Sequence, residues 1–380
     1  MGWLAGWAYR RAITITEQSG SDLTDYQVRI ELNSSNFDFS KANADGSDIR
    51  FTKDDGETLL PHWIEKWDSS NQQAVVWVKV PSIPANSDVT IYMYYGNSRA
   101  VSESDGEAVF EFFDDFDTFN ANWQDTGQLS WDLIEVANGE LHLVTGTVYG
   151  RRALTYNGYT FTDGIIEARI RIINYVAGIA YRFISDLQHY RATLSKAHST
   201  MAIQKFDSGK TTLASTTFTV TTPIYYHFVI KVSGSLHEFD VFDDAGTLLE
   251  SLSATDATFA SGGVGFWSYG DATYGRGELY VDWIRVRKYA EQEPTVSVST
   301  TEESAVINIS GVVQLPDGTP VGGAWVVAVR QVDNVIDDAT ISNSDGTFTL
   351  TVFKYKKYSI IAYPPGDATK NGDIKAHIQT

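Results

Sequence analysis

Short runs that alternate apolar and polar residues recur along the whole chain of 380 residues. Clear examples are residues 26–32, 74–80 and 164–172, each bounded by turn-forming Gly, Asn, Asp, Pro or Ser. A period of two places successive side chains on opposite faces of a strand. No long run has the 3.6-residue period of an amphipathic helix, although a short helix or turn is expected near 37–42. The pattern predicts an all-β protein.

Two alternating runs, at residues 112–117 and 280–286, enclose a segment that is β-like throughout. A sandwich whose first and last strands lie side by side requires this arrangement. We therefore expect these two strands to pair and to close a jelly roll in the middle of the chain.

Polar stretches suggest two domain boundaries. The first is 96–106, and the second is 291–304, which is rich in Ser, Thr and Glu and is predicted to be an extended linker. They divide the chain into an N-terminal β-sandwich at 1–105, a jelly roll at 106–291 and a small sandwich at 305–380. The prediction is three β-sandwich domains in series.

The charge balance excludes several partners. The chain carries a formal net charge of −19, so neither nucleic acid nor an anionic membrane surface is an expected partner. It contains no cysteine, which rules out disulfides and thiolate zinc sites. It begins with Met1 and has neither a signal-peptide pattern nor an apolar run long enough to span a bilayer, so we expect no membrane insertion.

The N-terminal segment resembles a β domain of unknown function from prokaryotic surface proteins and some viral proteins. The similarity lies in residues 7–15, 48–51, 60–65 and 91–97. It implies a β-sandwich and no activity.

Two further resemblances concern the rest of the chain. Residues 112–116, 139–143, 164–170, 263–267 and 281–286 are similar to concanavalin-like lectins and glucanases, including laminin-G-like jelly rolls. The turns at 316–318 and 344–346, with the strands around them, resemble the carboxypeptidase regulatory-like, transthyretin-like fold. Both resemblances specify fold better than function.

Many jelly rolls of this kind hold one structural Ca²⁺ where the first and last strands meet. The resemblance places that site at Asp115 and Asp282, with Asp114 and Asp117 as further candidate ligands. The alternative is that these acids face solvent on edge strands, where charge discourages edge-to-edge pairing.

A sugar site would use loop aromatics beside polar groups. Trp267, Tyr269, Asp271 and Tyr274 gather around Gly270, Gly275 and Gly277 and are the candidate carbohydrate contacts. The Glu-x-Asp-x-x-Glu strand that is typical of retaining glycosidases on this fold is missing from 106–291. We therefore expect no catalytic residues and no enzyme activity.

These features predict a non-catalytic structural or attachment protein. The leading hypothesis is a virion surface component, on capsid or tail, that assembles with other subunits as an oligomer and contacts host carbohydrate. The alternatives are a secreted or cell-surface glycan-binding adhesin of a prokaryote and, less favoured, a glycoside hydrolase.

Overall fold

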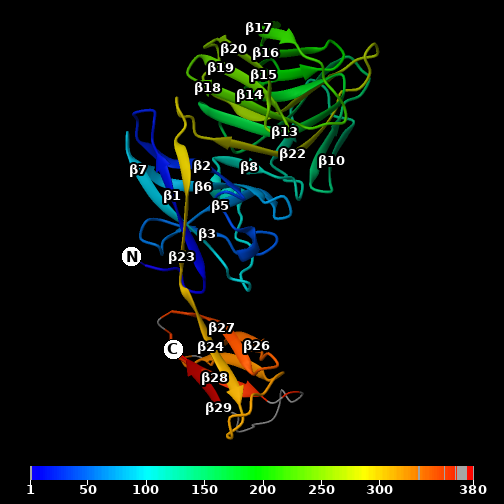
Figure 1. Cartoon of the computed structure of the whole chain (residues 1–380). Helices are drawn as coiled ribbons and strands as arrows, with labels where there is room; N and C mark the ends of the chain where they lie inside the picture. Colours follow the sequence, from blue (N-terminus) through cyan, green and yellow to red (C-terminus); the bar gives the residue numbers. More distant parts are fainter. Residues whose placement is uncertain (1, 333, 355, 364, 366–374, 380) are drawn as a thin grey trace.

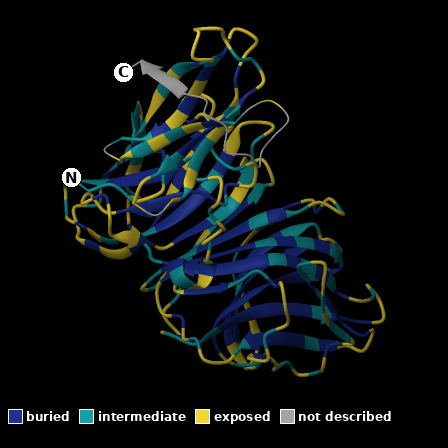
Figure 2. Cartoon of the chain, turned by 90° about the horizontal axis from the view of Figure 1, so that it is seen from below, coloured by how far each residue is buried: buried dark blue, intermediate teal, exposed yellow. Residues whose placement is uncertain are grey.

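Strands account for 58% of the residues and helices for 2%, which confirms the all-β prediction. The computed structural model describes residues 2–332, 334–354, 356–363, 365 and 375–379. Six sheets form three β-sandwiches, each with its own apolar core (Figure 1). Buried residues follow the strands, and exposed residues concentrate in the connecting loops (Figure 2).

The first sandwich packs a five-stranded sheet, β23-β1-β7-β3-β4, against a three-stranded sheet, β2-β6-β5. Alternation explains its core, because Ile13 and Ile15 of β1 and Val28 and Ile30 of β2 all point inward. A 3₁₀ turn at Phe39–Lys41 lies where the sequence predicts a short helix or turn. The strands are β1 Tyr9–Thr16, β2 Leu23–Asn33, β3 Arg50–Thr52, β4 Leu59–Leu60, β5 His62–Asp68, β6 Gln73–Ile83, β7 Asp88–Tyr95 and β23 Thr295–Ser304.

Strand β23 corrects the prediction of a linker at 291–304. It pairs antiparallel with β1, from Tyr9 opposite Ser304 to Thr16 opposite Thr295. Val296 and Val298, two residues apart, pack against the core of the first sandwich. The many Ser, Thr and Glu residues hide this short period-two pattern. The chain therefore leaves the first sandwich after β7, builds the jelly roll and returns to complete the first sheet.

The middle sandwich has an eight-stranded and a seven-stranded sheet around one large core. The first contains β10-β11-β22-β13-β18-β19-β20, with β8 beside β22, and the second has the order β17-β16-β15-β14-β21-β12-β9. The strands are β8 Phe112–Asp114, β9 Trp123–Asp125, β10 Leu133–Ala137, β11 Glu140–Val144, β12 Gly150–Tyr156, β13 Gly164–Asn174, β14 Val176–Ser185, β15 Gln188–Ser195, β16 Thr200–Asp207, β17 Lys210–Thr217, β18 Tyr226–Ser233, β19 Leu236–Asp243, β20 Leu248–Thr255, β21 Gly263–Gly270 and β22 Glu278–Arg287.

The first and last strands of this sandwich lie side by side, as predicted. Strand β8 pairs antiparallel with β22, with Phe112 opposite Val286 and Asp114 opposite Ile284. The first strand is shorter than expected, because Phe116 has a φ of 53° and turns the chain away.

The third sandwich is small. Its sheets have the orders β27-β24-β29 and β26-β25-β28. Strand β24 follows β23 after the single residue Ala305, whose N–H donates to the carbonyl of Ala8. An almost unbroken extended segment therefore joins the first sandwich to the third (Figure 1). The strands are β24 Val306–Gln314, β25 Trp325–Arg330, β26 Ile336–Ile341, β27 Thr347–Phe353, β28 Tyr358–Tyr363 and β29 Lys375–Gln379.

A buried charge network joins the first two sandwiches. Arg285 of β22 donates from Nε to Glu167 of β13 at 2.5 Å and from Nη1 to Glu65 of β5 at 2.8 Å. Arg287 adds a 2.8 Å bond to Glu167. Burial alone would raise the pKa of Glu167, but Arg285 and Arg287 hold it well below its usual value. The carboxylate therefore stays ionised inside the protein.

Aromatic side chains enclose this network. The guanidinium carbon of Arg285 lies 4.3 Å from the ring centre of Trp77 and 4.4 Å from that of Trp283. Trp63 meets Phe113 at a ring separation of 4.9 Å, so rings from both sandwiches exclude water from the ion pairs.

We predict that Arg285→Met destabilises the protein by about 3–5 kcal/mol, because Glu167 and Glu65 lose their shared buried counter-charge. Urea denaturation followed by tryptophan fluorescence measures the change. The matched control is Arg29→Met, which removes an exposed ion pair with Glu31 and should cost no more than about 1 kcal/mol. Equal costs for the two variants would contradict a dominant role for the network.

We also predict a loss of stability between pH 6.5 and pH 4. Burial lowers the pKa of His62 and of His189 to about 4, so the folded state holds both rings neutral while the unfolded chain protonates them near pH 6.5. The contribution is present above pH 6.5 and is lost as the pH falls, by roughly 3 kcal/mol for each ring at pH 4. His62→Gln and His189→Gln should each flatten the slope of unfolding free energy against pH. Unchanged slopes in both variants would refute this account.

Candidate functional site

The outer face of the seven-stranded sheet, which points away from the jelly-roll core, is hollowed by a cavity of about 700 Å³. Period-two alternation produces this face. On β21, Val264 and Phe266 face the core, and Trp267 and Tyr269 face outward. We call this hollow the sheet groove. Its lining includes Tyr149, Arg151, Tyr175, Arg191, His198, Gln204, Lys210, Trp267, Tyr269 and Asp271.

Aromatic rings form one side of the sheet groove. Tyr149 meets Tyr269 edge-on at a ring separation of 5.1 Å, and Tyr175 stacks on Tyr274 at 5.2 Å. His198 lies 4.7 Å from the ring of Tyr274. Tyr149 is 76% exposed and Tyr274 46% exposed, so both present ring surface to solvent. Such rings offer a ligand both an apolar face and a hydroxyl.

The floor of the groove is a stacked Arg–Trp pair. The guanidinium carbon of Arg191 lies 3.7 Å from the ring centre of Trp267. Nε of Arg191 donates to Oε1 of Gln204 at 2.8 Å. Trp267 is only 4% exposed, so it supports Arg191 from below and does not face solvent itself.

Asp271 organises the loop beside the groove. Its carboxylate accepts hydrogen bonds from the hydroxyl of Tyr175 at 2.8 Å and from the N–H groups of Thr273 and Tyr274 at 2.7 Å. Burial alone would raise the pKa of Asp271, but these hydrogen bonds lower it. Asp271 therefore fixes Tyr175 and Tyr274 in their stacked arrangement.

The structure brings together the four residues that the sequence suggests as carbohydrate contacts. Trp267, Tyr269 and Asp271 line the groove, and Tyr274 stacks on its edge. Sequence reasoning missed Arg191 and Gln204, which come from strands more than 60 residues earlier in the chain. One signal could have indicated Arg191. Its neighbours Tyr190 and Ala192 face the core, so alternation along the strand places Arg191 on the outer face.

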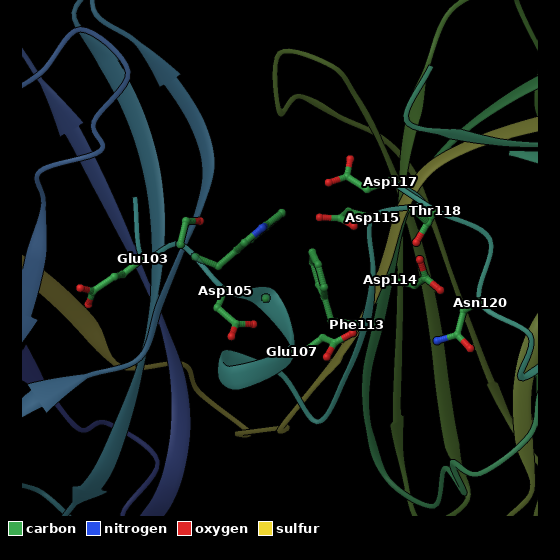
Figure 3. Close-up of a pocket in the computed structure, with 12 residues that line it drawn as sticks. Glu103, Asp105, Glu107, Phe113, Asp114, Asp115, Asp117, Thr118 and Asn120 are labelled. Carbon is green, nitrogen blue, oxygen red and sulfur yellow. The ribbon is translucent and has the colours of Figure 1, made fainter. Parts of the chain in front are cut away.

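A second cavity, of about 600 Å³, lies between the first sandwich and the jelly roll (Figure 3). We call it the acidic pocket, and no Lys or Arg is among the described residues that line it. Asp115 and Asp117 lie close together on its jelly-roll side, whereas Asp105 and Glu107 lie at the short helix α1, Gly106–Val109 (Figure 3). The carboxylates in its lining are Glu103, Asp105, Glu107, Asp114, Asp115 and Asp117.

The two predicted calcium ligands differ in their surroundings. Burial, then the charges of Asp117 and Asp282, raises the pKa of Asp115. Asp282 accepts a 3.0 Å hydrogen bond from Nη1 of Arg169, so a cation already neutralises it. Asp114 accepts from Nε1 of Trp123 at 2.7 Å. Within the described part of the chain, no three His, Asp or Glu side chains form a group suited to a metal ion.

Comparison of sequences identifies a recurrent domain in the chain. A family model described as a domain of unknown function, DUF2341, matches residues 45–133, so a DUF2341 domain is present. The match covers part of the first sandwich and extends into the jelly roll.

Two curated relatives are similar over part of the chain. Uncharacterized protein MJ1472 of Methanocaldococcus jannaschii is 29% identical over 161 residues, which are 38% of this chain and 29% of the relative. Uncharacterized protein 562 of Sulfolobus islandicus rod-shaped virus 1 is 37% identical over 89 residues, 23% of this chain and 16% of the relative. The chain thus spans less than a third of either relative.

Solved structures give distant matches. The carbohydrate binding module CBM66 from Bacillus subtilis is 15% identical, with a TM-score of 0.33, over 46% of this chain and 95% of that one. A laminarinase from Flavobacterium sp. UMI-01 is 14% identical, with a TM-score of 0.35, over 47% of this chain and 100% of that one. No helix in the described residues is long and apolar enough to cross a membrane.

Proposed function

We propose that this chain is a non-catalytic attachment protein whose jelly roll binds a glycan in the sheet groove. The observation that carries the proposal is the groove itself. It combines the exposed ring of Tyr149 with the polar groups of Arg191 and Gln204 in one cavity of about 700 Å³, and the exposed ring of Tyr274 stacks on Tyr175 at its edge. Ring faces and a few convergent polar groups are what a sugar, with its apolar and hydroxyl surfaces, requires of a site.

The acids near the groove support binding without catalysis. Glycoside hydrolysis generally needs two carboxylates, about 5–5.5 Å apart in retaining enzymes and about 6.5–9.5 Å apart in inverting ones. Among the described residues that line the groove, Asp271 is the single carboxylate, and Tyr175 and two backbone N–H groups hold it. Glu238 and Asp240, a same-face acid pair in the sequence, lie on β19 of the other sheet beside Lys231.

We propose the virion surface as the location, with other virion subunits as partners in an oligomer. Support comes from the viral relative, which is 37% identical over 89 residues. The alternative is a secreted or cell-surface adhesin of a prokaryote, and the archaeal relative favours neither a virus nor a cell surface. Mass spectrometry of purified virions tests the location, because persistent absence of this chain from the particles would exclude it.

We predict that the double variant Tyr149→Ala/Tyr269→Ala binds glycan roughly tenfold more weakly, because each lost ring contact is worth about 0.5–1.5 kcal/mol. A polysaccharide panel in native affinity electrophoresis first identifies a ligand for the wild type, and calorimetry then measures the variant. Tyr280→Ala is the matched control, since Tyr280 lies on the eight-stranded sheet and stacks on His142. A wild-type protein that binds no polysaccharide in the panel would overturn the proposed function.

We retain Ca²⁺ as a proposed structural ligand of Asp115, which lines the acidic pocket, and of Asp282 beside it. Glu103 pairs with Arg50 at 3.0 Å, whereas the other five carboxylates of that pocket form no ion pair within the described residues. A divalent cation would relieve the repulsion among them. We predict that CaCl₂ raises the melting temperature of the wild type and raises that of Asp115→Asn less. Asp45→Asn, in a surface turn of the first sandwich, should respond like the wild type. No heat in a calorimetric titration and no thermal shift would end the calcium hypothesis.

A further inference from the structure

Arg191 occupies an unusual electrostatic position in the sheet groove. It lies on β15 and is only 3% exposed. Its Nε donates to Gln204, whereas its buried Nη1 has no hydrogen-bond partner among the described residues. No carboxylate in the described part of the chain forms an ion pair with it. An uncompensated buried charge is destabilising, so a position of this kind needs an explanation.

Other arginines show that the chain pairs guanidinium groups with carboxylates elsewhere. Arg151, also in the groove lining, forms a 2.6 Å ion pair with Asp186, and Arg285 at the domain interface contacts two glutamates. The chain carries 48 acidic against 29 basic residues, so acids are abundant. Burial lowers the pKa of Arg191 to about 9, and the charge of Arg151 lowers it further while that of Asp186 raises it. The guanidinium is therefore charged near neutral pH and lacks a counter-charge.

The surroundings of Arg191 suit an incoming anion. The ring of Trp267 holds one face of the guanidinium, and the ring of Phe206 lies 5.6 Å away. Lys210 and His198 also line the groove, whereas the carboxylate of Asp271 is occupied by Tyr175. A planar guanidinium fixed in this way offers paired N–H donors to a carboxylate or sulfate.

We propose that the sheet groove selects glycans that carry an anionic group, a carboxylate or a sulfate, which pairs with Arg191. This inference rests on the proposed glycan-binding function and names the ligand class of that site. The net charge of −19 bears on this inference, because a protein with this charge repels a polyanion over most of its surface. Binding of such a polymer therefore requires a local cationic site.

The test compares matched polymers that differ in charge alone. Polygalacturonate against its fully methyl-esterified form gives the carboxylate arm, and dextran sulfate against dextran gives the sulfate arm. We expect at least a tenfold preference for the charged member of one pair, and the preferred arm identifies the anion. The preference should shrink between 0.05 and 0.5 M NaCl as salt screens the pair.

Three variants separate recognition by Arg191 from structural support. Arg191→Met should remove the charge preference and raise the melting temperature, because it removes an unpaired buried charge. Arg191→Lys keeps the charge without the planar fork and should retain part of the preference. Arg171→Gln is the matched control on the eight-stranded sheet, where Arg171 pairs with Glu140 at 3.2 Å, and it should leave the preference unchanged.

The outcomes distinguish this inference from the function on which it rests. Equal binding of neutral and charged polymers by the wild type would overturn the anionic ligand and leave glycan binding intact. An unchanged preference in both Arg191 variants would also overturn it. Binding of no polymer at all would overturn the proposed function itself.

Discussion

The molecule depends on one buried cation, Arg285, that two sandwiches share. Its guanidinium contacts Glu167 of the jelly roll and Glu65 of the first sandwich, under rings from both sides. Ion pairs have a preferred geometry, so buried ion pairs fix the relative orientation of the two sandwiches as well as their contact. An apolar interface alone constrains this orientation less. Strand β22, which carries Arg285, also pairs with β8, β11 and β13, so the interface and the closure of the jelly roll share a single strand.

Two arginines on opposite sheets of the jelly roll illustrate two uses of burial. Arg285 pairs with two carboxylates and holds two sandwiches together. Arg191 lies against an aromatic ring, and its one hydrogen-bond acceptor among the described residues is the amide oxygen of Gln204. The carboxylates around Arg285 stabilise the native state. The buried Nη1 of Arg191 has no hydrogen-bond partner among the described residues, so it can donate to a bound ligand. The contrast explains why the sheet groove is the proposed binding site and the interface is not.

Much of the architecture could be predicted from the sequence, because period-two alternation reports strands directly. The pairing of 112–114 with 284–286 followed from the position of two such runs. Strand β23 could not be predicted, since only Val296 and Val298 carry its pattern and the surrounding Ser, Thr and Glu imitate a linker. Only part of the groove could be predicted from the sequence. Its aromatic side could be, because four of its residues are close in sequence: Trp267, Tyr269, Asp271 and Tyr274. Arg191 could not, because only the pairing of β15 with β14 and of β14 with β21 brings it near them.

The return of the chain through β23 has a mechanical consequence. The covalent path from the jelly roll to the third sandwich runs through residues 288–294 and then through the ten-residue strand β23. Strand β23 is paired along β1 of the first sandwich, except at a bulge between Val298 and Glu302. Pairing with β1 therefore holds the strand part of this connection against the first sandwich. A pull between the jelly roll and the third sandwich would load β23 while it stays paired with β1, so the first sandwich would support this strand along most of its length.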